Sequence, residues 1–262
     1  MSLPAPLLPL AARPNEAAVL VDFDGSIAAI VDDPAAARVL PPARDAVARL
    51  IDVIATVAVV SGRPVEFLAR AIDVPGLILV GQYGLERMVD GRAVVDPRAE
   101  PYLDAVASAA DEVEWELPDL HIERKAGIAV TVHWRTAPER ERQAVEVVDR
   151  IARRHGLAVY PTKMAREVRP PVHADKGTAV EALVDGAANA CFAGDDRGDL
   201  DAFSALARLE AAGRLEHAVR IAVGSAEAPP ELTAQAELVV DGPAGLVSVL
   251  EELADAATRT PR

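Results

Sequence analysis

Residues 17–26 read AAVLVDFDGS, an apolar run that ends in two acidic residues and a glycine. The run 17–21 is too short for a helix, and its composition suits a strand buried on both faces, as in parallel sheets. Two similar runs follow at 56–60 and 77–80, each after a helical pattern and each ending in a polar turn with glycine. This alternation predicts a doubly wound α/β sheet, in which ligands gather at the carboxyl ends of the strands.

The middle of the chain has a different pattern. Asp90-Gly91 between short apolar segments predicts a hairpin over 86–95. The spacing predicts one half-exposed strand over 122–134, with helices before and after it. After residue 175 the buried strands return. We therefore expect a mostly parallel, Rossmann-like α/β core with an inserted smaller α+β cap. The expected bounds are 1–100 for the first part of the core, 101–170 for the cap and 171–262 for the second part of the core.

Composition narrows the class of protein. Of the 262 residues, 41 are acidic and 27 are basic, which gives a formal charge of −14. An acidic chain is poorly suited to nucleic acid or to anionic lipid, so we expect neither partner. No apolar run approaches the ~20 residues of a membrane span, and residues 1–12 lack the basic start of a signal peptide. We expect a cytoplasmic monomer in which the single Cys191 is a buried small hydrophobe.

Two carboxylates follow the first strand. Asp22 and Asp24 flank one residue, so on an extended segment their side chains point the same way. Such a pair repels unless a cation joins it. It suits a nucleophile beside a general acid/base, with Mg²⁺ holding an oxygen of the nucleophile. A solvated turn is the alternative that Asp and Gly also allow.

Other strand ends and one helix start carry matching groups. Ser61 ends the second strand and offers a hydroxyl to phosphate oxygens, and Lys176 precedes a predicted helix, where an anion would be favoured. Gly194-Asp195-Asp196 ends a later strand and offers oxygen ligands for Mg²⁺, with Asp199 nearby. Phosphoryl transfer needs this set of a nucleophile, a metal and donors on the transferring oxygens. A surface lysine and a calcium loop are the alternatives for these segments.

In this order the motifs at 22–26, 61, 176 and 194–196 resemble the four motifs of the haloacid dehalogenase superfamily of phosphatases. The resemblance implies that Asp22 is the nucleophile and Asp24 the general acid/base. It implies that Mg²⁺ is held by Asp22, the backbone carbonyl of Asp24 and Asp195, and that Ser61 and Lys176 bind the phosphoryl group. Two further residues would order the metal site indirectly, Asp196 and Asp199.

Within that superfamily the chain is similar to the trehalose-6-phosphate phosphatase family. The similar segments are SGRP at 61–64, GQYG at 81–84, ERK at 123–125, HWR at 133–135, EVRP at 167–170 and GDDRGD at 194–199. The family's Glu-x-Lys pair, which recognises the sugar from the cap, maps onto Glu123 and Lys125. The resemblance implies that Arg135 and Glu167 contact sugar hydroxyls and that Arg63 binds the substrate where core and cap join. Taken without the family, Glu123 and Lys125 also fit an ordinary cross-strand charge pair.

The expected activity is Mg²⁺-dependent hydrolysis of trehalose 6-phosphate, a small phosphorylated disaccharide, through a phospho-aspartyl intermediate. Two alternatives stay open. One is a phosphatase for another phosphosugar, such as sucrose phosphate or a glucosyl- or mannosyl-phosphoglycerate. The other is a regulatory module that binds a sugar phosphate without chemistry.

Overall fold

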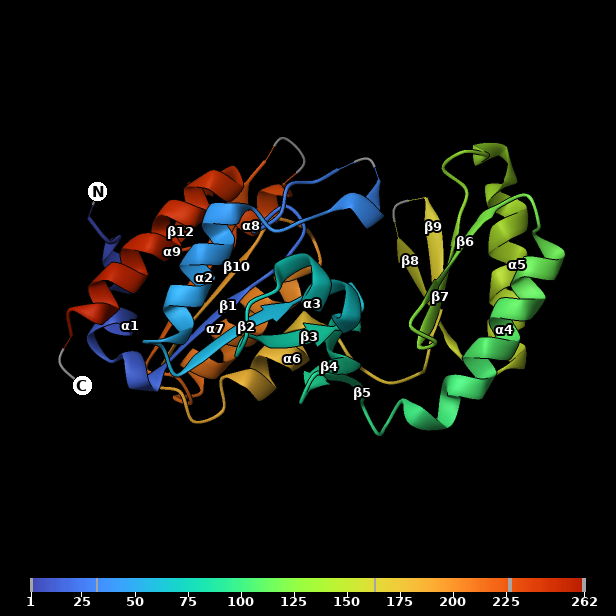
Figure 1. Ribbon diagram of the computed structural model, residues 1–262. Helices are drawn as coiled ribbons and strands as arrows, with labels where there is room; N and C mark the ends of the chain where they lie inside the picture. The colour runs from blue at the N-terminus through green and yellow to red at the C-terminus, as the bar shows by residue number, and fades with distance from the viewer. Residues whose placement is uncertain (1, 32, 163, 226–227, 261–262) are drawn as a thin grey trace. The chain divides into compact units, whose positions relative to one another are not determined.

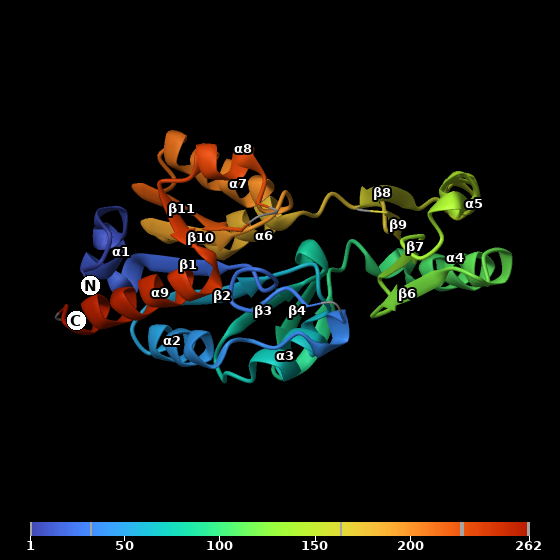
Figure 2. The same cartoon turned by 90° about the horizontal axis from the view of Figure 1, so that it is seen from above.

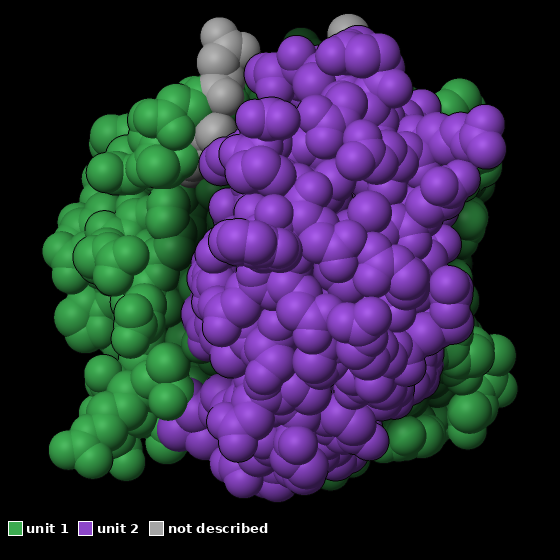
Figure 3. Space-filling view, turned by 90° about the vertical axis from the view of Figure 1, so that its right-hand side faces the viewer, with its two compact units in different colours: residues 1–93, 174–262 green, residues 94–173 purple. Residues whose placement is uncertain are grey.

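The computed structural model describes residues 2–31, 33–162, 164–225 and 228–260, and Figure 1 follows the chain from end to end. The chain divides into two compact units, which Figure 3 colours separately. Unit 1 comprises Met1–Ala93 and Ala174–Arg262, and unit 2 comprises Val94–His173. The insert expected at 101–170 falls within unit 2.

The larger sheet has eight strands in the order β12-β11-β10-β1-β2-β3-β4-β5. All pairs from β12 to β3 are parallel, and β4 runs antiparallel to β3. The predicted mostly parallel α/β core is therefore confirmed. Its strands are β1 (Ala17–Val21), β2 (Thr56–Val60), β3 (Ile78–Gly81), β4 (Glu86–Val89), β5 (Arg92–Val95), β10 (Asn189–Gly194), β11 (His217–Gly224) and β12 (Leu238–Asp241).

Helices cover both faces of this sheet. Figure 2 shows α2, α3 and α9 on one face and α6, α7 and α8 on the other. The helices of this unit are α1 (Leu8–Ala12), α2 (Pro41–Ile51), α3 (Val65–Ile72), α6 (Lys176–Leu183), α7 (Asp199–Ala211), α8 (Pro230–Gln235) and α9 (Gly242–Thr258). Among the described helices, none has the length and hydropathy of a membrane span.

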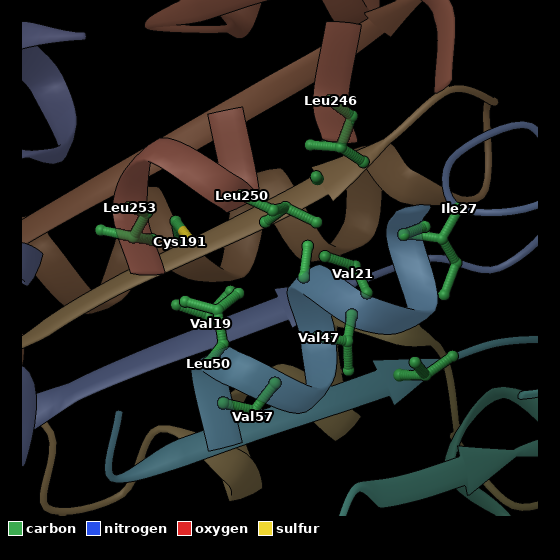
Figure 4. Packing of buried hydrophobic residues seen from close by; sticks show 14 of the residues in the cluster. Val19, Val21, Ile27, Val47, Leu50, Val57, Cys191, Leu246, Leu250 and Leu253 are labelled. Carbon is green, nitrogen blue, oxygen red and sulfur yellow. The ribbon is translucent and has the colours of Figure 1, made fainter. Parts of the chain in front are cut away.

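The core of unit 1 lies on both sides of β1. Alternate residues of a strand point to opposite faces, so Val19 and Val21 pack beneath α2 and α9, whereas Leu20 packs toward α6 and α7. Figure 4 shows Cys191 in the same cluster as Val19 and Val21, on the first of these faces. The thiol is fully buried, which raises its pKa to about 12. Cys191 is thus a core residue, as predicted.

Unit 2 is a four-stranded antiparallel sheet with two helices on one face (Figure 1). The strand order is β6-β7-β9-β8. Its elements are α4 (Leu103–Glu116), β6 (His121–Lys125), β7 (Ala129–His133), α5 (Glu141–Arg154), β8 (Ala158–Thr162) and β9 (Ala165–Arg169). Val130, Val132 and Val168 form its core together with residues of α4 and α5.

The single half-exposed strand predicted over 122–134 is wrong. The segment folds as two strands, β6 and β7, because Ala126 and Gly127 both take positive φ and make a tight turn between them. β7 is then an inner strand, and four of its five residues are buried. Helix α7, absent from the sequence prediction, packs Phe203 and Leu206 against the sheet of unit 1.

Candidate active site

Three neighbouring strands bring the predicted motifs to one edge of the sheet. In the order β10-β1-β2, Val21 is level with both Ala193 and Val59. The backbone N–H of Asp22 donates to the carbonyl of Ala193 over 2.8 Å, so β1 and β10 end together. Because the strands are parallel, the residues that follow them share this carboxyl edge.

A buried acidic cluster occupies this edge. One carboxylate oxygen from each of Asp22, Asp195 and Asp199 lies within 4.8 Å of the others. The Oδ1 atom of Asp195 is buried and has no hydrogen-bond partner among the described residues. Burial, together with the charges of Asp199 and Asp196, raises the pKa of Asp195 to about 7. Clustered hard oxygens with an unsatisfied atom among them fit a divalent cation such as Mg²⁺.

Both carboxylate oxygens of Asp199 accept hydrogen bonds from neighbouring residues. Its Oδ2 accepts hydrogen bonds from the backbone N–H groups of Asp195 (2.9 Å) and Asp196 (3.0 Å), and its Oδ1 accepts one from Lys176 (2.6 Å). These three bonds fix the loop that carries Asp195. Asp196 itself is exposed, and its Oδ1 accepts from the N–H of Gly198 just before α7.

Lys176 is the buried cation of the cluster. It is the first residue of α6, a helix that begins with a capping box between Asp175 and Thr178. Its Nζ lies 2.8 Å from Asp22 Oδ1 and 2.6 Å from Asp199 Oδ1, and the residue is 4% exposed. The alternative of a surface lysine is thereby wrong.

The protonation of this pair follows from its surroundings. Burial alone would lower the pKa of Lys176, but the charges of Asp199 and Asp22 outweigh it and raise the pKa well above its usual value. Burial raises the pKa of Asp22, and Lys176 offsets this only in part. One ammonium thus faces several buried carboxylates. Its single positive charge does not balance theirs, so a further cation would be favoured here.

Asp24 pairs with Arg63. The guanidinium donates from Nε to Oδ2 and from Nη2 to Oδ1, both over 2.8 Å. Ser61, which is buried, accepts a bond from the backbone N–H of Arg63 through its Oγ (3.2 Å). Gly25, which follows Asp24, has φ +75°, and a Cβ there would lie 2.0 Å from Asp195 Oδ2. Only glycine allows the two loops to approach this closely.

The predicted sugar-binding residues lie in unit 2. Glu123, Thr131 and Glu167 are in register across β6, β7 and β9. They share a face of the sheet with Lys125 and His133, because these positions alternate with the valines that pack on α4 and α5. We call this set of five the polar face. It brings together three of the predicted residues, Glu123, Lys125 and Glu167.

Glu167 is held by its neighbours on the polar face. Its Oε2 accepts bonds from Lys125 Nζ (2.6 Å) and Thr131 Oγ1 (3.3 Å), and it is buried. His133 Nε2 lies 3.3 Å from Glu123 Oε2. Arg135 is exposed in the turn after β7. Thr131 and His133 were not predicted as site residues, although their alternation with Val130 and Val132 places them on the same face as Glu123.

In this doubly wound core with an α+β insert, carboxylates at the ends of neighbouring parallel strands meet a buried lysine at the start of α6. This arrangement defines the haloacid dehalogenase class of phosphoryl-transfer proteins. The model of the trehalose-phosphatase family matches residues 20–243. The chain therefore belongs to the trehalose-phosphatase family.

Individual proteins agree with this membership. The trehalose-phosphate phosphatase of Mycobacterium avium is 33% identical over 254 residues, which cover 92% of this chain and 63% of that protein. The Mycobacterium leprae protein of the same name is 31% identical, covering 95% of this chain and 60% of its own length. This chain thus spans about three fifths of the length of these relatives.

Solved structures show the same fold. A trehalose-6-phosphate phosphatase related protein has a TM-score of 0.76 at 23% identity, covering 92% of this chain and 98% of that one. The C-terminal domain of the Candida albicans trehalose-6-phosphate phosphatase has a TM-score of 0.73 at 23% identity, and 95% of each chain is covered.

Proposed function

We propose that this chain is a Mg²⁺-dependent phosphatase that hydrolyses trehalose 6-phosphate to trehalose and phosphate. One observation carries the proposal: the buried Asp22 carboxylate contacts Lys176 and lies within 4.8 Å of oxygens of Asp195 and Asp199. A regulatory module that only binds a sugar phosphate would not need this costly grouping of buried carboxylates. Membership of the trehalose-phosphatase family supports the choice of substrate.

The acidic cluster supports a metal site. The carboxylates of Asp22 and Asp195, with the backbone carbonyl of Asp24, would hold Mg²⁺, and Asp199 would keep the Asp195 loop in place. When bound, the ion would neutralise the charge of the phosphoryl oxygens and of the attacking carboxylate. The unsatisfied Oδ1 of buried Asp195 is the atom that most needs such a partner.

The chain's own residues supply two chemical steps. In the first, an Asp22 oxygen attacks phosphorus, the bond between phosphorus and the sugar oxygen breaks, and Asp24 gives its proton to that oxygen. In the second, Asp24 takes a proton from water as the water oxygen displaces the Asp22 carboxylate from phosphorus. Lys176 and Ser61 hold the phosphoryl oxygens in both steps.

Unit 2 would act as the cap that selects the sugar. Its polar face presents Glu123 and Lys125, and charged groups form strong, directional hydrogen bonds with hydroxyls. Glu167 would hold the Lys125 ammonium in place, since its Oε2 accepts hydrogen bonds from Lys125 and Thr131. We expect Arg135, which is exposed after β7, to contribute a further contact.

The test is Asp22→Asn, which keeps the shape of the side chain but removes the nucleophile. We expect kcat on trehalose 6-phosphate to fall at least about 10³-fold, with no loss of thermal stability. Phosphate release is measured with and without Mg²⁺, over a panel that includes sucrose phosphate and a glucosyl-phosphoglycerate. Substantial turnover by the variant would refute the nucleophile, and faster turnover of another phosphosugar would replace the substrate.

A further inference from the structure

The carboxylate of Asp24 is held by a two-point contact. Arg63 donates to both of its oxygens over 2.8 Å, from Nε and from Nη2. A bidentate guanidinium pair fixes orientation as well as distance, because the two parallel bonds define a plane. The Asp24 side chain is 36% exposed, so burial alone does not choose its rotamer. The direction in which this carboxylate points is set by Arg63.

Arg63 is in turn held by aromatic packing. Its guanidinium carbon lies 4.7 Å from the centre of the Phe67 ring, which is on α3. The Phe67 ring meets the ring of Phe23 edge to face, with centroids 5.9 Å apart. Phe23 is the residue between Asp22 and Asp24. The aromatic pair therefore links the arginine back to the segment that carries both carboxylates.

The backbone of the arginine loop is also braced. Gln82 N–H donates to the carbonyl of Arg63, and Tyr83 N–H donates to that of Ser61, each over 3.1 Å. Gln82 and Tyr83 have φ of 50° and 58°, in the left-handed region that residues other than glycine rarely adopt. A Cβ on the preceding Gly81 would lie 2.5 Å from the Arg63 carbonyl oxygen. A strained turn thus packs closely against the loop and restricts the backbone conformation of Arg63.

We propose that Arg63 is a positioning residue that aims the Asp24 carboxyl group at the oxygen of the leaving group. The inference rests on the proposed function and replaces the expectation that Arg63 serves chiefly as a substrate contact. In the first step the proton of Asp24 moves to the ester oxygen as its bond to phosphorus breaks. Without the guanidinium fork, Asp24 samples several rotamers and this transfer is seldom aligned.

The consequence depends on the leaving group. A sugar alkoxide must receive a proton as it departs, whereas p-nitrophenolate leaves readily as an anion. General acid catalysis contributes about 10²–10⁴-fold where it is needed. Loss of the positioning residue therefore slows trehalose 6-phosphate and phenyl phosphate far more than p-nitrophenyl phosphate. A residue that only supports the fold would slow all three alike.

The experiment compares Arg63→Met and Arg63→Lys with the wild type on these three esters. We expect kcat/KM of Arg63→Met to fall about 10²-fold on trehalose 6-phosphate and less than about threefold on p-nitrophenyl phosphate. Arg63→Lys keeps the charge without the fork and should recover part of the loss. Arg70→Met, an exposed arginine on α3, is the matched control and should resemble the wild type.

Two outcomes overturn the positioning role. Equal losses on all three esters would make Arg63 structural, and a rise in KM confined to the sugar phosphate would make it a substrate contact. Thermal unfolding checks that each variant folds, and Arg63→Lys carries the test if Arg63→Met does not. The proposed function fails if the wild type does not hydrolyse the esters, or if Asp22→Asn hydrolyses them as fast as the wild type. An unchanged leaving-group dependence in an active, Asp22-dependent enzyme overturns only the role of Arg63.

Discussion

Asp195 combines burial with repulsion, and a metal ion would relieve both. Its Oδ1 lacks a hydrogen-bond partner among the described residues, and its pKa is raised to about 7 by burial and by Asp199 and Asp196. We predict that Asp195→Asn weakens Mg²⁺ binding at least about tenfold, because even indirect metal contacts contribute this much. Isothermal titration with MgCl₂ alone, at about pH 8 where Asp195 is ionised, measures the effect. Asp45→Asn, an exposed carboxylate on α2, should leave the affinity unchanged; equal affinity in Asp195→Asn would contradict the site.

For single residues, the position of a site side chain could be predicted from the sequence better than its contacts could. Asp22 and Asp195 could be placed at one edge because each directly follows a buried apolar run, and parallel strands align such ends. The pair of Asp24 with Arg63 could not be foreseen in the same way. The direction of a long arginine depends on packing against Phe67, which belongs to another element.

Single helices depend on partners from distant strands, as α3 does on Glu86. This β4 residue is 3% exposed, and its Oε2 accepts from the N–H of Val65, the first residue of α3, over 2.8 Å. Burial raises the pKa of Glu86 above its usual 4.5, more than that bond lowers it. The folded state then holds this proton more tightly than the unfolded state. The stability that protonated Glu86 contributes is present below about pH 4.5 and is lost as the pH rises through the folded pKa.

We therefore predict that Glu86→Gln, which stays neutral and keeps an acceptor oxygen, flattens this decline in the free energy of unfolding. Urea unfolding of the metal-free protein, from about pH 4.5 to neutral, measures the difference. Asp45→Asn, at an exposed position on α2, is the control and should keep the slope of the wild type. Parallel curves for Glu86→Gln and the wild type would show that Glu86 does not titrate in this range.

Element boundaries show where sequence patterns are sufficient. β1 and β2 match the predicted runs 17–21 and 56–60 because each buried apolar strand ends at a polar turn. The turn between β6 and β7 was not predicted, since Ala126 is no turn residue and the alternation continues across it. Helix α7 was missed although Phe203, Leu206 and Leu209 have helical spacing. Their pattern follows directly on the motif at 194–199, whose glycine and aspartate residues are typical of a loop.

At the scale of the whole molecule, the proposed function would divide the work between the two units, with the groups for chemistry in unit 1 and the groups for selection in unit 2. The order of strands in both units depends on tertiary pairing, which the hydrophobic periodicity of a sequence does not predict. The insertion was predicted from the change in that periodicity along the chain. The polar face offers a matched pair of neighbours on β6. Lys125 lies on that face, bonded to Glu167, and Arg124 lies on the opposite face, paired with Glu114 and Asp111 of α4.

This opposition allows selection to be separated from chemistry. We predict that Lys125→Met lowers kcat/KM for trehalose 6-phosphate about 10- to 100-fold, the loss of one or two hydrogen bonds from a charged group. Hydrolysis of p-nitrophenyl phosphate, which carries no sugar, should change less than about twofold, because Asp22 and Lys176 are untouched. Arg124→Met removes an equal charge from the adjacent residue and should leave both rates near those of the wild type. Steady-state kinetics on both esters decide the matter: equal losses on the two substrates in Lys125→Met would mean that unit 2 serves the reaction rather than the choice of sugar.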